Sequence, residues 1–182
     1  MLRSRLIAAR AARPANDIAA AGVALAEQAS RAWSNAGTVA TYAATGTEPP
    51  TRTMIDRLSA LGVRVLLPVV VDTGLRWAPY DGWDRLVPGP LGLLQPAGAL
   101  LPAGVLHEVD VVAAPALAVD RHGRRLGRGG GYFDRALADV PPSVSVAVVY
   151  DDEVLDEVPT QAHDRDVGAA LTPSALRPLP AA

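Results

Sequence analysis

Buried apolar runs alternate along this chain with segments of helical spacing, and this alternation limits the possible folds more than any other feature. Residues 63–71, 109–114 and 143–150 are apolar runs bounded by turn residues, which is typical of strands buried on both faces. The segments expected to be helical are residues 2–13, 17–33, 51–61 and 132–139. Helices that alternate with buried strands predict an α/β protein with a largely parallel sheet.

Glycine and proline divide these elements from one another. Pro14 separates the first two helices, Asp17 is the expected cap of the second, and Gly62 ends the third. Residues 38–43 and 75–79 are expected to form further strands, and residues 81–104 are rich in Gly and Pro and predict irregular structure. From Asp151 onward we expect mostly loop. No linker or repeat divides the chain, so residues 1–182 are expected to form a single domain.

Composition excludes several kinds of chemistry. The chain has no cysteine, and all 17 of its basic residues are arginine. Thiolate catalysis, cysteine-ligated metals, Schiff bases and the P-loop lysine are therefore excluded. The net charge of -2 provides no overall basic field for nucleic acid. Four prolines interrupt the longest uncharged stretch, residues 86–106, which argues against a membrane span. We expect a cytoplasmic protein without nucleic-acid or membrane partners.

The segment 120–134, Asp-Arg-His-Gly-Arg-Arg-Leu-Gly-Arg-Gly-Gly-Gly-Tyr-Phe-Asp, follows a buried strand and leads into a helix. Ligands of such sheets bind beyond the carboxyl ends of the strands. Glycines let backbone N–H groups approach a ligand and adopt positive φ, and arginine forks match phosphate oxygens. Asp134 could hold a hard cation there. These features favour a nucleotide-polyphosphate site with a metal, although a flexible glycine turn with a solvated basic face would have the same residues.

A longer pattern, residues 111–135, resembles the signature of the 5-formyltetrahydrofolate cyclo-ligase family, also called methenyltetrahydrofolate synthetases. That signature runs Pro-x-Leu-x-Phe-Asp-x-x-Gly-x-Arg-Leu-Gly-x-Gly-x-Gly-Tyr-Tyr-Asp. Shorter stretches resemble other elements of the family in the same order along the chain: residues 47–51, 62–68, 92–96 and 158–164, which include His163. The resemblance therefore covers nearly the whole chain. It implies a three-layer α/β fold, an open and largely parallel sheet flanked by helices, Rossmann-like and similar to the sugar-phosphate isomerase and CoA-transferase type.

The resemblance also implies functional residues. The ATP site would consist of Arg3, Arg125, Leu126, Gly127, Arg128, Gly129, Gly130, Gly131, Tyr132 and Phe133. The folate site would consist of Arg3, Ala43, Glu48, Arg128, Gly129, Gly130, Gly131 and Tyr132. Arg128 and Tyr132 would be catalytic, and Asp134 and Asp164 would be the magnesium ligands. By position alone, Glu48 is more typical of a solvated loop residue.

The implied reaction converts ATP and 5-formyltetrahydrofolate into 5,10-methenyltetrahydrofolate, ADP and phosphate. ATP is then a co-substrate, Mg²⁺ the cofactor, the partners are small molecules, and we expect a monomer. Two alternatives stay open: a catalytically degenerate relative that binds folate or nucleotide as a regulator, and a sugar-phosphate isomerase or acyl-CoA transferase with a similar sheet.

The sequence departs from the family pattern at three places. The family's N-terminal helix usually has an ATP-binding lysine a few residues before the position of Arg3, and this sequence begins too late to include it. Phe133 replaces the commoner second tyrosine, and Val119 replaces a phenylalanine. For the histidines His107 and His122 we expect exposed loop positions, and for the three tryptophans packing rather than ligand stacking.

Overall fold

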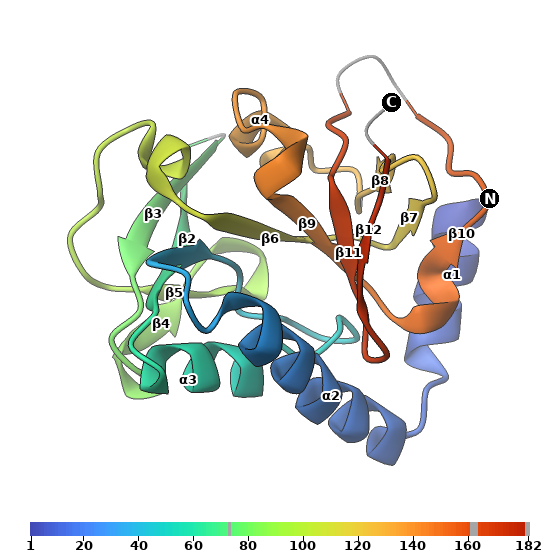
Figure 1. The fold of residues 1–182 in the computed structure, drawn as a ribbon, viewed down its shortest axis with the longest axis horizontal. Helices are drawn as coiled ribbons and strands as arrows, with labels where there is room; N and C mark the ends of the chain where they lie inside the picture. The colour runs from blue at the N-terminus through green and yellow to red at the C-terminus, as the bar shows by residue number, and fades with distance from the viewer. Residues whose placement is uncertain (73, 161–163, 181–182) are drawn as a thin grey trace.

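A mixed sheet forms the centre of the protein (Figure 1). The structure, a computed structural model, describes residues 1–72, 74–160 and 164–180, and within these ranges seven strands form the central sheet in the order β12-β11-β9-β6-β1-β2-β3. Their bounds are β1 Thr38–Ala40, β2 Arg64–Val71, β3 Gly74–Pro79, β6 Val111–Pro115, β9 Ser145–Val148, β11 Ala169–Leu171 and β12 Leu176–Pro178. The five inner strands run parallel to one another, and the edge strands β3 and β12 are antiparallel to β2 and β11.

Four α-helices are found in the described part of the chain: α1 Leu2–Ala11, α2 Ala15–Trp33, α3 Arg52–Ala60 and α4 Tyr132–Ala136. Pro14, not the predicted Asp17, is the N-cap of α2. Asp17 lies in the first turn, where a carboxylate still interacts favourably with the free N–H groups. α4 is shorter than predicted, because Leu137 and Val140 turn into the core instead of continuing the helix.

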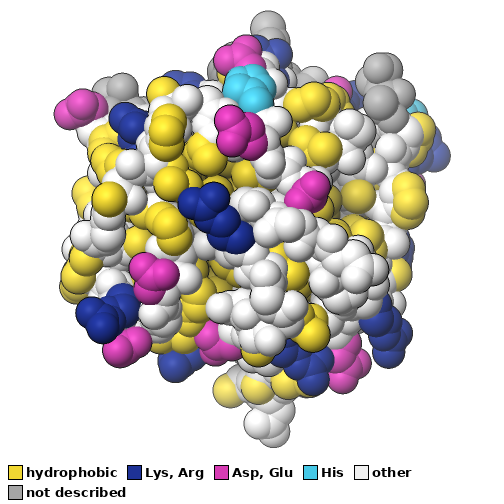
Figure 2. Space-filling model, turned by 60° about the vertical axis from the view of Figure 1, so that its left-hand side comes forward, with side chains coloured by type: hydrophobic (Ala, Val, Ile, Leu, Met, Phe, Trp, Pro, Cys, Tyr) yellow, Lys and Arg dark blue, Asp and Glu magenta, His cyan; other side chains and the backbone are white. Residues whose placement is uncertain are grey.

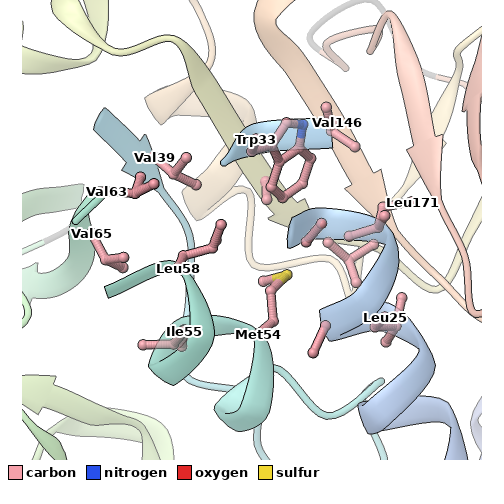
Figure 3. Close-up of a cluster of buried hydrophobic side chains, with 14 of the residues drawn as sticks. Leu25, Trp33, Val39, Met54, Ile55, Leu58, Val63, Val65, Val146 and Leu171 are labelled. Carbon is pink, nitrogen blue, oxygen red and sulfur yellow. The ribbon is translucent and has the colours of Figure 1, made fainter. Parts of the chain in front are cut away.

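Alternate residues of the strands point to opposite faces of the sheet and make two cores. Val39 and Leu67 pack on the side of α2 and α3, in a cluster with Leu25, Met54 and Leu171 (Figure 3). Their neighbours Ala40, Leu66 and Val112 pack on the other side against Leu106, Leu137 and Val140, which surround α4. Helical layers therefore cover both faces, and the predicted three-layer α/β class with a largely parallel sheet is confirmed.

The prediction of mostly loop from Asp151 onward holds for most of the described residues of this segment, but it missed three short strands. β11 and β12 lie in this segment and extend the central sheet by two strands, while β10 Val154–Leu155 pairs with β7 Ala118–Asp120. These strands have two or three residues each, too few for an alternating pattern to show in the sequence. They form because neighbouring strands offer them hydrogen-bond partners.

Two smaller sheets complete the fold. β7 also pairs with β8 Arg125–Leu126, so residues 120–124 form a tight turn rather than the open loop expected from their glycine and charge content. α1 lies beside this sheet (Figure 1), with Leu2 and Leu6 packed against Ala118 and Leu126. Within the segment expected to be irregular, β4 Leu86–Pro88 and β5 Leu94–Pro96 form a two-stranded sheet.

The surface beside β2 and β3 carries hydrophobic side chains interspersed with acidic and basic ones (Figure 2). Basic side chains are scattered over this face and do not gather in one patch. Among the helices of the described chain, none combines the length and the apolar character required to cross a membrane.

Candidate active site

A cavity of about 300 Å³ lies beyond the carboxyl ends of β1 and β6. Ala43 follows β1, Pro115 is the last residue of β6, and Ala116 comes directly after it. The glycine-rich loop before α4 forms another part of the cavity wall. The predicted site residues that line it are Ala43, Glu48, Arg125, Gly127, Arg128, Gly129, Gly130, Gly131, Tyr132, Phe133 and Asp134. Residues far apart in the sequence thus meet at the position where an open α/β sheet usually binds its ligand.

The glycine loop is shaped by two residues with left-handed backbone. Gly129 has φ +102° and Gly131 has φ +66°, a region that other residues adopt only with strain. Gly127 and Gly130 do not have positive φ, contrary to prediction. At Gly130 the reason for glycine is space, because a Cβ atom would lie 3.2 Å from the ring of Tyr132. The loop therefore keeps its backbone open toward the cavity.

A buried ion pair between Arg125 and Asp134 joins β8 to α4 at the cavity wall. The side chains are 2% and 15% exposed, and the Arg125 guanidinium also donates to the carbonyl of Pro115 at 3.0 Å. Burial lowers the pKa of Arg125, while the charges of Asp134 and Asp164 oppose this shift. The two predicted metal ligands thus both act on one buried cation, although their positions are 30 residues apart in the chain.

These carboxylates are compatible with magnesium. Mg²⁺ is usually bound by one or two carboxylates together with substrate phosphates and waters, so a complete protein cage is not required. In the described part of the chain no group of three or more acidic, His or Cys side chains gathers around one point. His163 of the family's tail pattern lies outside the described residues.

Glu48 faces the cavity and is not the solvated loop residue that its sequence position alone suggests. Its side chain is 10% exposed and lies 3.5 Å from the Nε of Arg128. It also accepts a hydrogen bond of 2.8 Å from the backbone N–H of Thr45. The loop is fixed by Thr51, whose hydroxyl accepts from the N–H of Ala44 and donates to the carbonyl of Tyr42. Glu48 is therefore held in place before any ligand arrives.

Three of the predicted residues do not line the cavity. Leu126 is 1% exposed and packs with Ala118 and Val158, so only its backbone could contact a nucleotide. Arg3 reaches the glycine loop from outside, where its Nε donates to the carbonyl of Gly127 at 3.1 Å. The negative charge of Asp164 opposes the downward shift in the pKa of the buried Arg125, so this carboxylate lies within electrostatic range of the cavity wall.

Sequence reasoning missed most of the apolar wall. Pro68, Leu75, Leu93 and Leu94 line the cavity opposite the glycine loop. Their segments are the β2–β3 hairpin and the turn before β5, which a pattern of local residues identifies only as strand or loop. The resemblance of residues 62–68 and 92–96 to family elements was the available signal.

Aromatic packing supports the other side of the cavity. Phe133 lies edge-on between Tyr42 and Trp77, with ring centroids 6.3 and 6.2 Å apart. Burial raises the pKa of Tyr42 well above its usual value, so the phenol stays neutral. Trp33 and Trp77 are buried in the core and Trp83 packs against it, as expected for the tryptophans. The ring of Phe133 thus occupies a fixed place without needing a hydroxyl.

Comparison with known proteins gives a consistent result. Residues 1–173 match the family model described as the 5-formyltetrahydrofolate cyclo-ligase family. A 5-formyltetrahydrofolate cyclo-ligase of Mycolicibacterium smegmatis is 44% identical over 143 residues, which cover 75% of this chain and 73% of the relative. The protein of that name from Escherichia coli K12 is 31% identical over 144 residues, covering 76% and 79%.

Two solved structures have a similar fold. The 5,10-methenyltetrahydrofolate synthetase of Aquifex aeolicus superimposes with a TM-score of 0.80 at 24% identity, covering 98% of this chain and 91% of that one. The synthetase of Mycoplasma pneumoniae gives a TM-score of 0.71 at 16% identity, covering 93% and 95%. At these identities the likeness concerns the fold.

Proposed function

Because the chain belongs to the 5-formyltetrahydrofolate cyclo-ligase family and is an enzyme of that kind, we propose that it closes 5-formyltetrahydrofolate to 5,10-methenyltetrahydrofolate at the expense of ATP. ADP and phosphate are the other products. The observation that supports this most directly is the single cavity that joins Arg125, Arg128 and the open glycine loop to Glu48 and an apolar wall. The arginines and the glycine loop are suited to a polyphosphate, and Glu48 with the apolar wall is suited to a reduced pterin.

The chemistry requires activation of a poor leaving group. A formamide oxygen does not leave readily, but transfer of the γ-phosphoryl group to that oxygen makes it part of a good leaving group. The N10 amine of the same molecule then attacks the formyl carbon, loses its proton, and expels phosphate as the five-membered ring closes. Because the attack is intramolecular, the protein has mainly to align the reacting groups. No lysine or cysteine nucleophile is needed.

The cationic residues of the glycine loop are suited to the phosphoryl transfer. Such transfers are accelerated by alignment and by neutralisation of the charge on the phosphoryl oxygens. Arg128 is half-exposed at the cavity, where its Nε lies 3.5 Å from Glu48, and Tyr132 lines the same cavity with the guanidinium of Arg135 5.1 Å from its ring. We assign Arg128 and Tyr132 to the reacting phosphate, and the backbone of residues 125–133, with Arg3, to ATP binding.

Glu48 and Ala43 are assigned to the folate. The Glu48 carboxylate accepts hydrogen bonds and faces the cavity beside Arg128, so it can receive N–H groups from a pterin ring. Asp134 and Asp164 would hold magnesium, which when bound neutralises phosphate charge and fixes the triphosphate in one geometry. Asp134 can do so only with the oxygen that Arg125 does not occupy.

The absorbance that develops as the methenyl bridge forms tests this function. Purified protein mixed with ATP, MgCl₂ and 5-formyltetrahydrofolate should produce that absorbance with one ADP per methenyl group, and omission of ATP should abolish it. Arg128→Gln should lower kcat by about 100-fold, the size typical of losing one stabilising contact to developing charge. Arg85→Gln, an exposed arginine away from the cavity, is the matched control.

Three results would contradict the proposal. Folate or nucleotide binding without turnover would indicate the regulatory relative. Turnover that does not depend on ATP would indicate isomerase or transferase chemistry. Full activity in Arg128→Gln would remove that residue from the mechanism.

A further inference from the structure

Arg10 is the most deeply buried charge of helix α1, although the helical pattern places it on a face expected to be polar. Its side chain is 1% exposed. It meets Glu153, which is 2% exposed, through two hydrogen bonds of 2.7 Å, one from Nε and one from Nη2. Burial lowers the pKa of Arg10, but the hydrogen bond and charge of Glu153 more than offset this, so the guanidinium stays charged. A bidentate ion pair of this kind fixes the relative orientation of the two side chains as well as their distance.

Both partners are hydrogen-bonded to backbone groups, and Arg10 is bonded to a residue that lines the cavity. Nη2 of Arg10 also donates to the carbonyl of Ala116 at 2.6 Å, and Glu153 accepts the backbone N–H of Tyr150 at 2.9 Å. Ala116 lines the cavity, and the carbonyl before it, that of Pro115, is held by Arg125. The buried guanidinium groups of Arg10 and Arg125 therefore donate hydrogen bonds to two consecutive carbonyls at the end of β6, those of Ala116 and Pro115. Arg10 belongs to α1, and Arg125 belongs to β8, just before the glycine-rich loop.

The same helix carries Arg3, which bonds to Gly127 in the glycine loop. Arg3 and Arg10 are seven residues apart, two helical turns, so they lie on the same side of α1. A ten-residue helix is marginal by itself, and its N-cap Met1 provides no side-chain hydrogen bond. The described apolar contacts of α1 with this sheet come from Leu2 and Leu6. Leu2 and Leu6 attach the end of the helix near Arg3, and Arg10 attaches the other end, so the two attachments together set the direction of the helix axis that carries Arg3.

We propose that Arg10 and Glu153 are positioning residues: the ion pair anchors α1 against the end of β6 and thereby sets Arg3 against the nucleotide-binding loop. This inference rests on the proposed function, in which Arg3 and the loop bind ATP. A buried ion pair adds little net stability compared with apolar residues of the same shape, while it does restrict the arrangements its partners can adopt. Restriction of α1 is the property that the site requires.

The first test is a double-mutant cycle on the KM for ATP. Glu153→Gln, nearly isosteric, should raise this KM about tenfold, within the range of coupling between residues of one network, with a much smaller change in kcat. The double variant with Arg3→Ala should have the KM of Arg3→Ala alone, because Arg3 has nothing further to lose. Glu27→Gln, an exposed glutamate of α2, is the charge-matched control. Met54→Ala, which removes a core side chain of α3, controls for loss of stability.

The second test needs no turnover and therefore separates this inference from the proposed function. Amide hydrogen exchange without ligand should become faster in residues 3–11 and 127–131 of Glu153→Gln, and should be unchanged there in Met54→Ala under native conditions. Should Glu153→Gln fail to fold, Glu153→Asp, which retains the charge but shortens its reach, is measured in the same way. The proposal would be overturned if hydrogen exchange were unchanged in both segments. It would also be overturned if the increase in KM for ATP in the double variant equalled the product of the increases in Glu153→Gln and Arg3→Ala.

Discussion

The two ends of this molecule are stabilised by different means. Between the sheet and α2 and α3, the buried cluster consists of apolar side chains such as Leu25, Met54 and Leu58 (Figure 3). At the carboxyl end of the sheet, the buried groups include charges: Arg10 with Glu153, Arg125 with Asp134, and Asp120 with Arg124. Apolar burial is insensitive to direction, whereas each buried charge needs its partner in place.

This difference separates stability from activity. Removing a buried methyl group leaves a cavity that the surroundings partly fill, but removing one member of a buried ion pair leaves an uncompensated charge. Of these charges, Arg125 and Asp134 line the cavity, and Arg10 donates to the carbonyl of Ala116, which also lines it. The two regions should therefore respond differently to substitution.

The largest effect is expected at the charged end, from Asp134→Asn. The variant leaves Arg125 buried without its carboxylate, so unfolding free energy should fall by about 3–5 kcal/mol. Turnover should fall by at least about 100-fold, because a charged group at the proposed phosphate site is lost. Urea unfolding and the methenyl absorbance assay measure the two losses, and exposed Asp139→Asn on the same segment is the control. If Asp134→Asn had the stability and turnover of the wild type, the proposed difference between the charged end and the apolar end of the molecule would be contradicted.

At the apolar end, Met54→Ala should affect stability alone. Met54 is fully buried, and its truncation should cost about 2–5 kcal/mol of unfolding free energy. Under conditions where the variant is folded, its kcat and both KM values should equal those of the wild type. Leu61→Ala, at the exposed end of α3, should change stability by no more than about 0.5 kcal/mol. A changed KM in Met54→Ala would show that the core also shapes the site.

A smaller, pH-dependent effect is expected for Asp120. Its fully buried carboxylate accepts hydrogen bonds from the N–H groups of His122, Arg124 and Val158, and from the Arg124 guanidinium. Burial alone would raise the pKa of Asp120, but these donors stabilise the carboxylate and the net shift is downward. Asp120 therefore stabilises the fold fully above its unfolded pKa of about 4, and this contribution is lost as the pH falls through the lower pKa of the folded state.

Asp120→Asn should thus reduce unfolding free energy by about 1–3 kcal/mol at neutral pH. Urea unfolding at a series of pH values should show the difference from wild type shrinking below about pH 4, where the wild-type carboxylate also becomes protonated. Exposed Asp156→Asn is the control. A difference that stays constant into acid would mean that the charge of Asp120 is not what holds the turn between β7 and β8.

The sequence by itself determined the α/β class, the main parallel strands and the segment that shapes the loop at the cavity. Long apolar runs and helical spacing are local patterns, whereas the glycine-rich, arginine-rich segment after a buried strand was by itself compatible with both a polyphosphate site and a flexible glycine turn. The resemblance added Glu48, which no local pattern distinguishes from a surface residue, and Asp164 as a second proposed metal ligand beside Asp134.

Only the tertiary structure decided which charges are buried and what they hold. Arg10 and Glu153 are 143 residues apart, and neither differs in the sequence from exposed arginines and glutamates nearby. The short strands β11 and β12, the apolar wall of the cavity and the core position of Leu126 were likewise decided by neighbours distant in the chain. Burial of a polar group depends on a partner that folding brings to it, and that partner is not written in the local sequence.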